Sequence, residues 1–372
     1  MANQNLIKIE YDVFKTAKYE DIVFLTYIFQ WAPLNSIPRY NYFIDIKTSS
    51  EIEQHDNFKK LPEVNQKFIK EQFIKVVQAG KRNNYTYLIT NKSNRKKNEF
   101  TLQKAIRFFM TPVSIVLENS LNDSYFLNSL FNHFDDNSTI TEYLKNGWIH
   151  YVNAGGWTNV ENYIDGITHS LINFSDNPNK YIRCFVLIDS DRQYEDFDVT
   201  SKNDLKLRLE QKGVKFHILN KRAMENYMPD EMITELPNLP FLVANRTKYQ
   251  KWISAYSYLG DKQKDYLNYQ KGFPKEDLTK KNKKRNLQPI QIQELYASTV
   301  TEPINPSINV ISDIQYEVLD IGLKEFPKFK DEFPKLFQDS RFVHRKSLLK
   351  REGGTKDENE FIEIIQKVSS LL

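Results

Sequence analysis

Cysteine is nearly absent from this chain of 372 residues, in which Cys184 is the only one. A disulfide within the chain is therefore impossible, and a zinc site built from several thiolates is excluded. Cys184 lies inside an apolar run, so we expect it to be a small buried side chain. The six histidines are scattered, and no pair of them has the spacing of metal ligands.

Long apolar segments are also missing. The longest, around residues 22–31, is too short to span a bilayer, and charged residues interrupt the first twenty positions where a signal peptide would be apolar. We therefore expect a cytoplasmic protein without membrane attachment. A net charge of only +4 excludes a general polycation, while 40% hydrophobic and 13% aromatic residues are enough to build a core. The length allows two or three domains.

Three regions differ in their sequence pattern. Residues 1–110 are mixed and helix-rich, with a helix expected over 61–78 and a strand over 85–90. Residues 111–230 alternate between short apolar runs and helical patterns. Residues 231–372 are again helical and partly basic, with several prolines as breaks.

The middle region predicts an α/β fold with a parallel sheet. Strands are expected over 113–117, 148–152, 183–188 and 214–219, with helices over 123–134, 159–173 and 204–212 between them. Such alternation places helices on both faces of a parallel sheet, and right-handed crossovers bring the strand-end loops to one edge.

Acidic residues follow three of these four strands. Glu118 comes after the first, Asp189 and Asp191 after the third, and Glu225 after the fourth, while Asp123 opens the helix after Glu118. Carboxylates at one sheet edge repel one another unless a cation lies between them. Carboxylate oxygens favour a hard divalent ion, so we expect Mg²⁺ or Mn²⁺ there. Glu225 could alternatively be a helix-start acid favoured by the helix dipole.

The order of these motifs resembles the Toprim domain of topoisomerases, bacterial primases and OLD-family nucleases. That domain has a Glu after its first strand, a small Gly-rich turn after its second and Asp-x-Asp after its third. The corresponding segments here are Val116–Asp123, Val152–Gly156 and Val186–Arg192, and Lys221–Tyr227 is similar to the Glu-Asn-Tyr element of the OLD type. The resemblance covers about residues 112–230, and it implies Glu118, Asp123, Asp189, Asp191 and Glu225 as metal ligands.

Two features depart from that family. Asn119 stands where the family usually has Gly, and Asp123 lies five residues after Glu118 where four are usual. A phosphate-binding Gly-x-x-x-x-Gly-Lys-Ser/Thr motif is absent, although full-length OLD nucleases carry an ATPase in the same chain. By this resemblance the chain corresponds to the nuclease half alone, which implies a separate ATPase partner.

A basic stretch follows the sheet region. Between Arg246 and Arg285 there are twelve Lys or Arg residues against four Asp or Glu, interleaved with aromatic residues. This mixture suits nucleic acid through phosphate neutralisation and base stacking, but it equally suits a solvated helix face over an aromatic core. OLD-type enzymes use a lysine near the scissile phosphate, and the candidates here are Lys264 and Lys271.

The sequence therefore predicts a metal-dependent endonuclease that cuts DNA, with RNA as a possible substrate. Glu118, Asp189, Asp191, Glu225 and Lys271 are the expected catalytic residues. The resemblance further implies a phage-defence effector that works with a separate ATPase, and a homo-oligomer is possible. The alternative is a catalytically degenerate Toprim protein that binds nucleic acid or acts as a scaffold, which Asn119 and the displaced Asp123 favour. A primase or topoisomerase relative ranks last.

Overall fold

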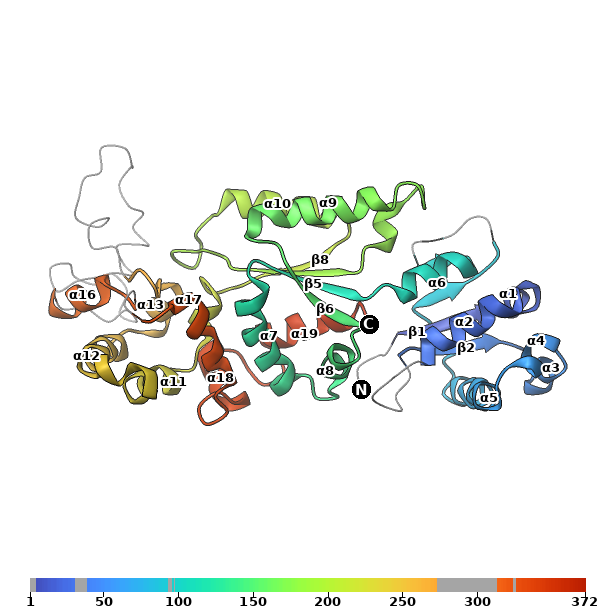
Figure 1. The fold of residues 1–372 in the computed structure, drawn as a ribbon, viewed down its shortest axis with the longest axis horizontal. Helices are drawn as coiled ribbons and strands as arrows, with labels where there is room; N and C mark the ends of the chain where they lie inside the picture. The colour runs from blue at the N-terminus through green and yellow to red at the C-terminus, as the bar shows by residue number, and fades with distance from the viewer. Residues whose placement is uncertain (1–4, 31–38, 93–95, 97, 273–312, 324–325) are drawn as a thin grey trace.

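The computed structural model describes residues 5–30, 39–92, 96, 98–272, 313–323 and 326–372. The fold is α/β, with two four-stranded parallel sheets flanked by helices. The molecule is elongated, with the first sheet at one end, the second sheet in the middle and most of the C-terminal helices at the other end (Figure 1). Among the described residues no helix combines the length and apolar character needed to cross a membrane.

The first sheet was only partly anticipated by the sequence. Its strand order is β2-β1-β3-β4, and all pairs are parallel. The expected strand and helix correspond to β3 and α5, whereas β1 and β2 were not predicted. The elements are β1 (Leu6–Glu10), α1 (Tyr11–Thr16), α2 (Tyr19–Gln30), β2 (Asn41–Asp45), α3 (Ser49–Glu53), α4 (Asp56–Lys60), α5 (Glu63–Gln78), β3 (Tyr87–Ile89), β4 (Glu99–Phe100) and α6 (Leu102–Met110).

The second sheet confirms the four strands expected in the middle region. Its order is β6-β5-β7-β8, and all pairs are again parallel. Because β5 and β7 are neighbours, Glu118 and Asp189 follow adjacent strands at the same edge of the sheet. The short helix α8 was not predicted. The elements are β5 (Val113–Leu117), α7 (Ser120–Phe134), α8 (Thr139–Lys145), β6 (Ile149–Asn153), α9 (Val160–Ser170), β7 (Cys184–Ile188), α10 (Thr200–Gln211) and β8 (Lys215–Ile218).

Alternate residues of the central strands β5 and β7 face opposite layers, as a pleated strand requires. Val116, Val186 and Ile188 pack with residues of α9 and α10 on one face. Ile115 and Leu187 belong to a second core on the other face, together with residues of α7, α8 and the last helix of the chain. Helices therefore cover both faces, and every residue of β5 and β7 is buried, Cys184 included.

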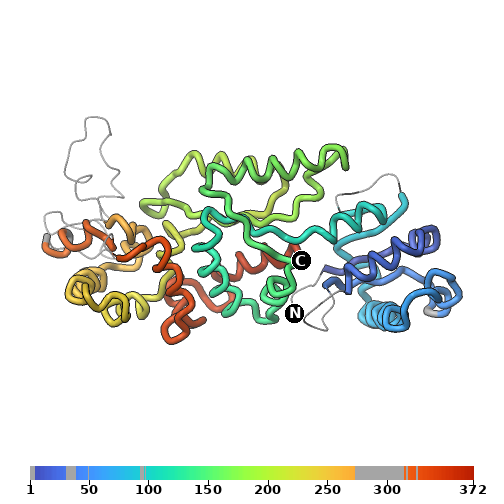
Figure 2. Tube along the Cα trace, in the orientation of Figure 1, coloured from blue at the N-terminus to red at the C-terminus, as the bar shows by residue number. Residues whose placement is uncertain are grey.

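The described part of the C-terminal region is helical. Its helices are α11 (Asp230–Glu235), α12 (Arg246–Ser257), α13 (Asp261–Tyr266), α16 (Asp313–Asp320), α17 (Phe329–Glu332), α18 (Arg345–Glu352) and α19 (Glu360–Ser369), with short 3-10 turns such as η3 (Met224–Tyr227). Most of them lie beyond the carboxyl ends of the central strands, at the end of the molecule away from the first sheet, but α19 returns to the centre and packs against α7, α8 and β8 (Figure 2). The sequence did not indicate that this distant helix completes a layer of the central sheet.

A buried arginine joins the three parts of the molecule. Arg183, just before β7, is 3% exposed and donates to the Tyr40 hydroxyl (2.7 Å) and the Thr111 carbonyl (2.9 Å). Its other terminal nitrogen donates to the carbonyl of Leu371 at 2.6 Å. One guanidinium thus connects the first sheet region, the central sheet and the C-terminus.

We expect Arg183→Met to lower the free energy of unfolding by about 3 kcal/mol, because it leaves several buried acceptors without a donor. Equilibrium unfolding in guanidinium chloride measures this change in free energy. Arg208→Met is the control, since Arg208 forms a half-exposed ion pair with Glu161 and should change stability by less than about 1 kcal/mol. Equal effects of the two substitutions would contradict the bridging role of Arg183.

Candidate functional site

The strand-end loops of the central sheet are tied to one another by backbone contacts at its carboxyl edge. Glu118 follows β5, and its Oε1 accepts a hydrogen bond from the Asp189 amide after β7 at 3.2 Å. Asp189 Oδ1 in turn accepts from the Met224 amide after β8 at 3.1 Å. The Gly156 amide after β6 donates to the Glu118 carbonyl at 3.1 Å. The structure therefore brings together the loops that carry the predicted acids.

The Gly155-Gly156 turn follows β6 at this edge. Both glycines have positive φ values, 72° and 116°, which residues with a side chain rarely adopt. The backbone conformation alone accounts for the two glycines, which favours the interpretation as a tight strand-to-helix turn.

Asp123 lies at the start of α7, close to Glu118. Its Oδ2 accepts from the Asn119 amide at 2.8 Å, while the Asn119 side chain caps the same helix. Burial raises the pKa of Asp123 to about 7 against the effect of that hydrogen bond, and the charges of Glu118 and Glu225 act in the same direction as burial. Asp123 thus belongs to the acidic group and also supports the turn after β5.

Asp189 is the electrostatic centre of this group. Burial raises its pKa well above the ordinary value, and the nearby charges of Glu225, Glu118, Asp123 and Asp191 raise it further. Burial also raises the pKa of Glu118, and so does the charge of Asp191. The acids are close enough to perturb one another, so they cannot all carry a charge without a compensating cation.

Asp191 has a different environment. Its side chain is 55% exposed, and its backbone has a φ of 55°, a left-handed conformation that Asp tolerates better than most residues. The Asp191 amide donates to the Arg222 carbonyl at 2.9 Å, which fixes this loop against the segment after β8. The carboxylate is thus held at the solvent-facing side of the acidic group.

Lys202 is the residue of this site that the sequence interpretation missed. Its ammonium lies 2.5 Å from Asp191 Oδ2 and 3.9 Å from Glu118 Oε1, and it donates to the Asp189 carbonyl. Its side chain is only 3% exposed. One feature of the sequence could have indicated that Lys202 is buried. This lysine lies three and seven residues before Leu205 and Leu209, so it falls on the apolar, inward-facing side of α10.

The donor chemistry of the site suits a hard cation. Glu118, Asp189 and Asp191 offer carboxylate oxygens, with Glu225 beside them, and these are the ligands that Mg²⁺ and Mn²⁺ prefer. Among the described residues, however, no three acidic, histidine or cysteine side chains are arranged to hold a metal ion as they stand. In this arrangement the Lys202 ammonium lies among Glu118, Asp189 and Asp191.

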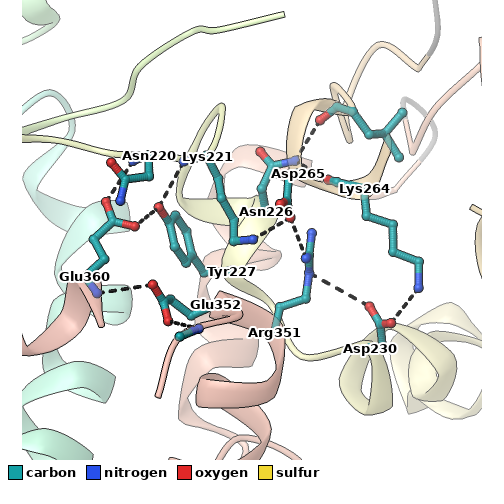
Figure 3. A network of polar contacts seen from close by, with 12 residues as sticks. Asn220, Lys221, Asn226, Tyr227, Asp230, Lys264, Asp265, Arg351, Glu352 and Glu360 are labelled. Atoms are coloured by element: carbon teal, nitrogen blue, oxygen red, sulfur yellow. Dashed lines mark hydrogen bonds and ion pairs between the residues drawn. The ribbon is translucent and has the colours of Figure 1, made fainter. Parts of the chain in front are cut away.

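The three residues of the Glu-Asn-Tyr element after β8 have two different roles. Asn226 and Tyr227 are buried: Asn226 donates to the carbonyls of Lys264 and Leu267, and the Tyr227 hydroxyl donates to Glu360 on α19 (Figure 3). Burial raises the pKa of Glu225, the charge of Lys330 lowers it, and that of Asp191 raises it. Glu225 thus belongs to the acidic group, while its two neighbours anchor the turn.

The predicted lysines lie in different surroundings. Lys264 Nζ is 2.6 Å from Asp230 Oδ2, and its side chain is 9% exposed, so it forms a buried ion pair between C-terminal helices (Figure 3). In the described part of the chain no contact joins Lys264 to the acids of the site, and its role near a scissile phosphate stays a prediction. Lys271 is exposed, and no contact among the described residues joins it to the acids. Its catalytic role stays a prediction.

The aromatic residues of the basic stretch are mostly core residues. Burial decides between the two interpretations for five of the rings. An aromatic core is confirmed, and base stacking is excluded, for Tyr249, Trp252, Tyr256, Tyr266 and Tyr269. Tyr258 is 52% exposed. Arg246, Lys248 and Lys251 lie on the exposed face of α12. Phe273 and the dense basic part, Lys280–Arg285, lie outside the described residues.

One histidine and one surface pocket lie outside the acidic group formed by Glu118, Asp123, Asp189, Asp191 and Glu225. His217 on β8 contacts Glu360 Oε1 at 2.7 Å, so its ring faces the C-terminal helix α19. A surface pocket of about 480 Å³ is lined by residues that include Lys104, Lys180 and Lys212, and none of the acids of the site lines it.

Comparisons of this chain with protein-family models, with curated proteins and with solved structures found no match. The functional interpretation consequently depends on the residues and the geometry of the chain itself.

Because Asp230 forms an ion pair with Lys264, we expect the free energy of unfolding to depend on pH. Burial raises the pKa of Asp230, but the hydrogen bond and charge of Lys264 and the charge of Arg351 outweigh it, so the pKa lies below 3.8. A lowered pKa stabilises the fold above the unfolded-state value, and this contribution is lost as the pH falls through the folded-state value. We expect Asp230→Asn to destabilise the protein by about 3 kcal/mol at pH 7, because it leaves the Lys264 ammonium buried without its counter-charge.

Urea unfolding at a series of pH values measures this difference. The gap between wild type and Asp230→Asn should be constant from neutral pH down to about pH 5 and should shrink below about pH 4. Asp12→Asn is the control, because Asp12 is 77% exposed in its pair with Lys15. A gap that persists unchanged in acid would contradict the prediction.

Proposed function

We propose that this chain is a Toprim-type, metal-dependent nuclease that hydrolyses phosphodiester bonds in DNA, with RNA as the other possible substrate. The observation that carries the proposal is the convergence of Glu118, Asp189, Asp191 and Glu225 from three strand ends of one parallel sheet. The strand order supports it, since β5 and β7 are neighbours and deliver Glu118 and Asp189 side by side. Open α/β sheets bind their ligands at this edge.

In this proposal Glu118, Asp189 and Asp191 hold Mg²⁺ or Mn²⁺, with Glu225 and Asp123 as further acids of the same group. A bound divalent ion would supply Lewis acidity toward a phosphoryl oxygen and would lower the pKa of a coordinated water. The chain's own contribution is positioning. The Met224 amide orients the Asp189 carboxylate, the Asp189 amide orients that of Glu118, and the exposed Asp191 faces the side from which a nucleic acid approaches.

The proposal also includes a protein partner and a nucleic-acid partner. Because the sequence has no Gly-x-x-x-x-Gly-Lys-Ser/Thr motif, we propose a separate ATPase partner, as the OLD-type resemblance implies, and a role as a phage-defence effector. Exposed cations of α12 offer contacts to a phosphate backbone, which bind without base specificity.

A catalytically degenerate Toprim protein that binds nucleic acid is the second candidate. It is favoured by the Lys202 ammonium among the acids and by the absence, in the described part of the chain, of a ready-made group of three ligands. A Mn²⁺ titration of the purified wild-type protein separates the two. Saturable binding supports the nuclease, and no binding supports the degenerate form.

Asp189→Asn should abolish activity without harming the fold. The amide keeps an oxygen for the Met224 amide but removes the charge, so we expect cleavage with Mg²⁺ or Mn²⁺ to fall by about 100-fold or more. In EDTA the variant should be more stable than wild type by about 1 kcal/mol, because it relieves repulsion among the acids.

Cleavage of plasmid DNA and of structured RNA, together with thermal unfolding in EDTA, tests both parts. Reconstitution with the ATPase partner belongs to the same assay. Asp196→Ala, an exposed acid in the same loop, is the control and should keep wild-type cleavage. Full activity of Asp189→Asn would refute the proposed site.

A further inference from the structure

Lys202 occupies a position that its own helix does not favour. It lies in the first turn of α10, where the helix dipole disfavours a cation. Its side chain is only 3% exposed. Burying an ammonium group is itself unfavourable unless opposite charges surround it. The reason for a lysine here must therefore lie outside α10.

The surroundings of the ammonium come from three different strand-end loops. Asp191 Oδ2 at 2.5 Å and the Asp189 carbonyl follow β7, and Glu118 Oε1 at 3.9 Å follows β5. The Trp157 ring, 5.9 Å from Nζ, follows the Gly-Gly turn after β6 and covers another side. The Lys202 ammonium thus lies where the loops of β5, β6 and β7 meet.

We propose that Lys202 is a positioning residue that acts as an internal counter-ion. Its ammonium holds the cation position among Glu118, Asp189 and Asp191 in the metal-free protein and leaves this position when a divalent ion binds. The inference rests on the proposed metal site, and it adds a competition between a side chain and the metal. The four-carbon stem of lysine is flexible enough to withdraw the charge.

This role has two consequences. The ammonium and a divalent ion repel each other at short range, so Lys202 weakens metal binding and keeps the free protein from taking up the ion readily. The same ammonium reduces the repulsion among the acids, so its removal destabilises the metal-free fold. A lysine that served only to contact substrate would have neither effect.

The test compares wild type with Lys202→Met and Lys206→Met, a matched control because Lys206 lies one turn further along α10 with an exposed side chain. Isothermal titration with Mn²⁺ alone, without nucleic acid, should give a Kd for Lys202→Met lower than wild type by about tenfold, and within about twofold of wild type for Lys206→Met. In EDTA, Lys202→Met should melt at a lower temperature than wild type. Saturating Mn²⁺ should restore its melting temperature.

The possible results separate the counter-ion from the nuclease. If wild type binds Mn²⁺ and Lys202→Met binds it no better, the counter-ion is refuted while the proposed metal site stands. If only Lys202→Met binds Mn²⁺, Lys202 blocks the site permanently, so both its withdrawal and the metal-dependent nuclease are refuted, and wild type is the degenerate form. If none of the three proteins binds Mn²⁺, both proposals fail.

A second measurement uses the unmodified protein and decides the matter if Lys202→Met does not fold. Acetylation of lysines, followed by peptide mass spectrometry, reports whether each ammonium group is accessible. Lys202 should be labelled several-fold faster in saturating Mn²⁺ than in EDTA, while Lys206 should react equally in both. An unchanged rate for Lys202 in wild type that binds Mn²⁺ would refute the counter-ion.

Discussion

Repulsion among carboxylates at the carboxyl edge of the central sheet is the constraint on which the described site depends. Asp189 lies within reach of four other acids, and burial strengthens their mutual effect. The fold keeps them together with backbone amides directed at Asp189 and Glu118 and with the ammonium of Lys202. Such a concentration of like charge works against stability, and this is typical of functional sites.

Residues far away in the sequence hold this edge in place. The segment after β8, which supplies the amide that binds Asp189, is itself fixed by a buried polar network (Figure 3). Lys221 and Arg351 both contact Asp265, and Glu360 accepts from Tyr227 and from the Asn220 amide. Because α18 and α19 carry Arg351 and Glu360, packing of the C-terminal helices determines where the turn with Glu225 lies.

The sequence predicted the central sheet well but not the first one. β5 and β7 are continuous apolar runs, a pattern typical of parallel strands that are buried on both faces. β1 has an alternating burial pattern and carries Lys8 and Glu10, and it runs directly into α1, so its apolar signal is short. For the aromatic residues of α12 the sequence left base stacking and an aromatic core equally open, because ring spacing does not reveal which face of a helix packs inward. The structure shows that these rings are core residues.

What the sequence determined by itself is the set of strand ends and the acids that follow them, since apolar runs and their abrupt ends depend only on local pattern. Tertiary structure decided the rest. It put the Lys202 ammonium among these acids, paired Lys264 with Asp230, and joined α19 to the central sheet. Contacts of this kind link residues separated by many positions, and a local pattern contains no information about which distant partner a buried charge will meet.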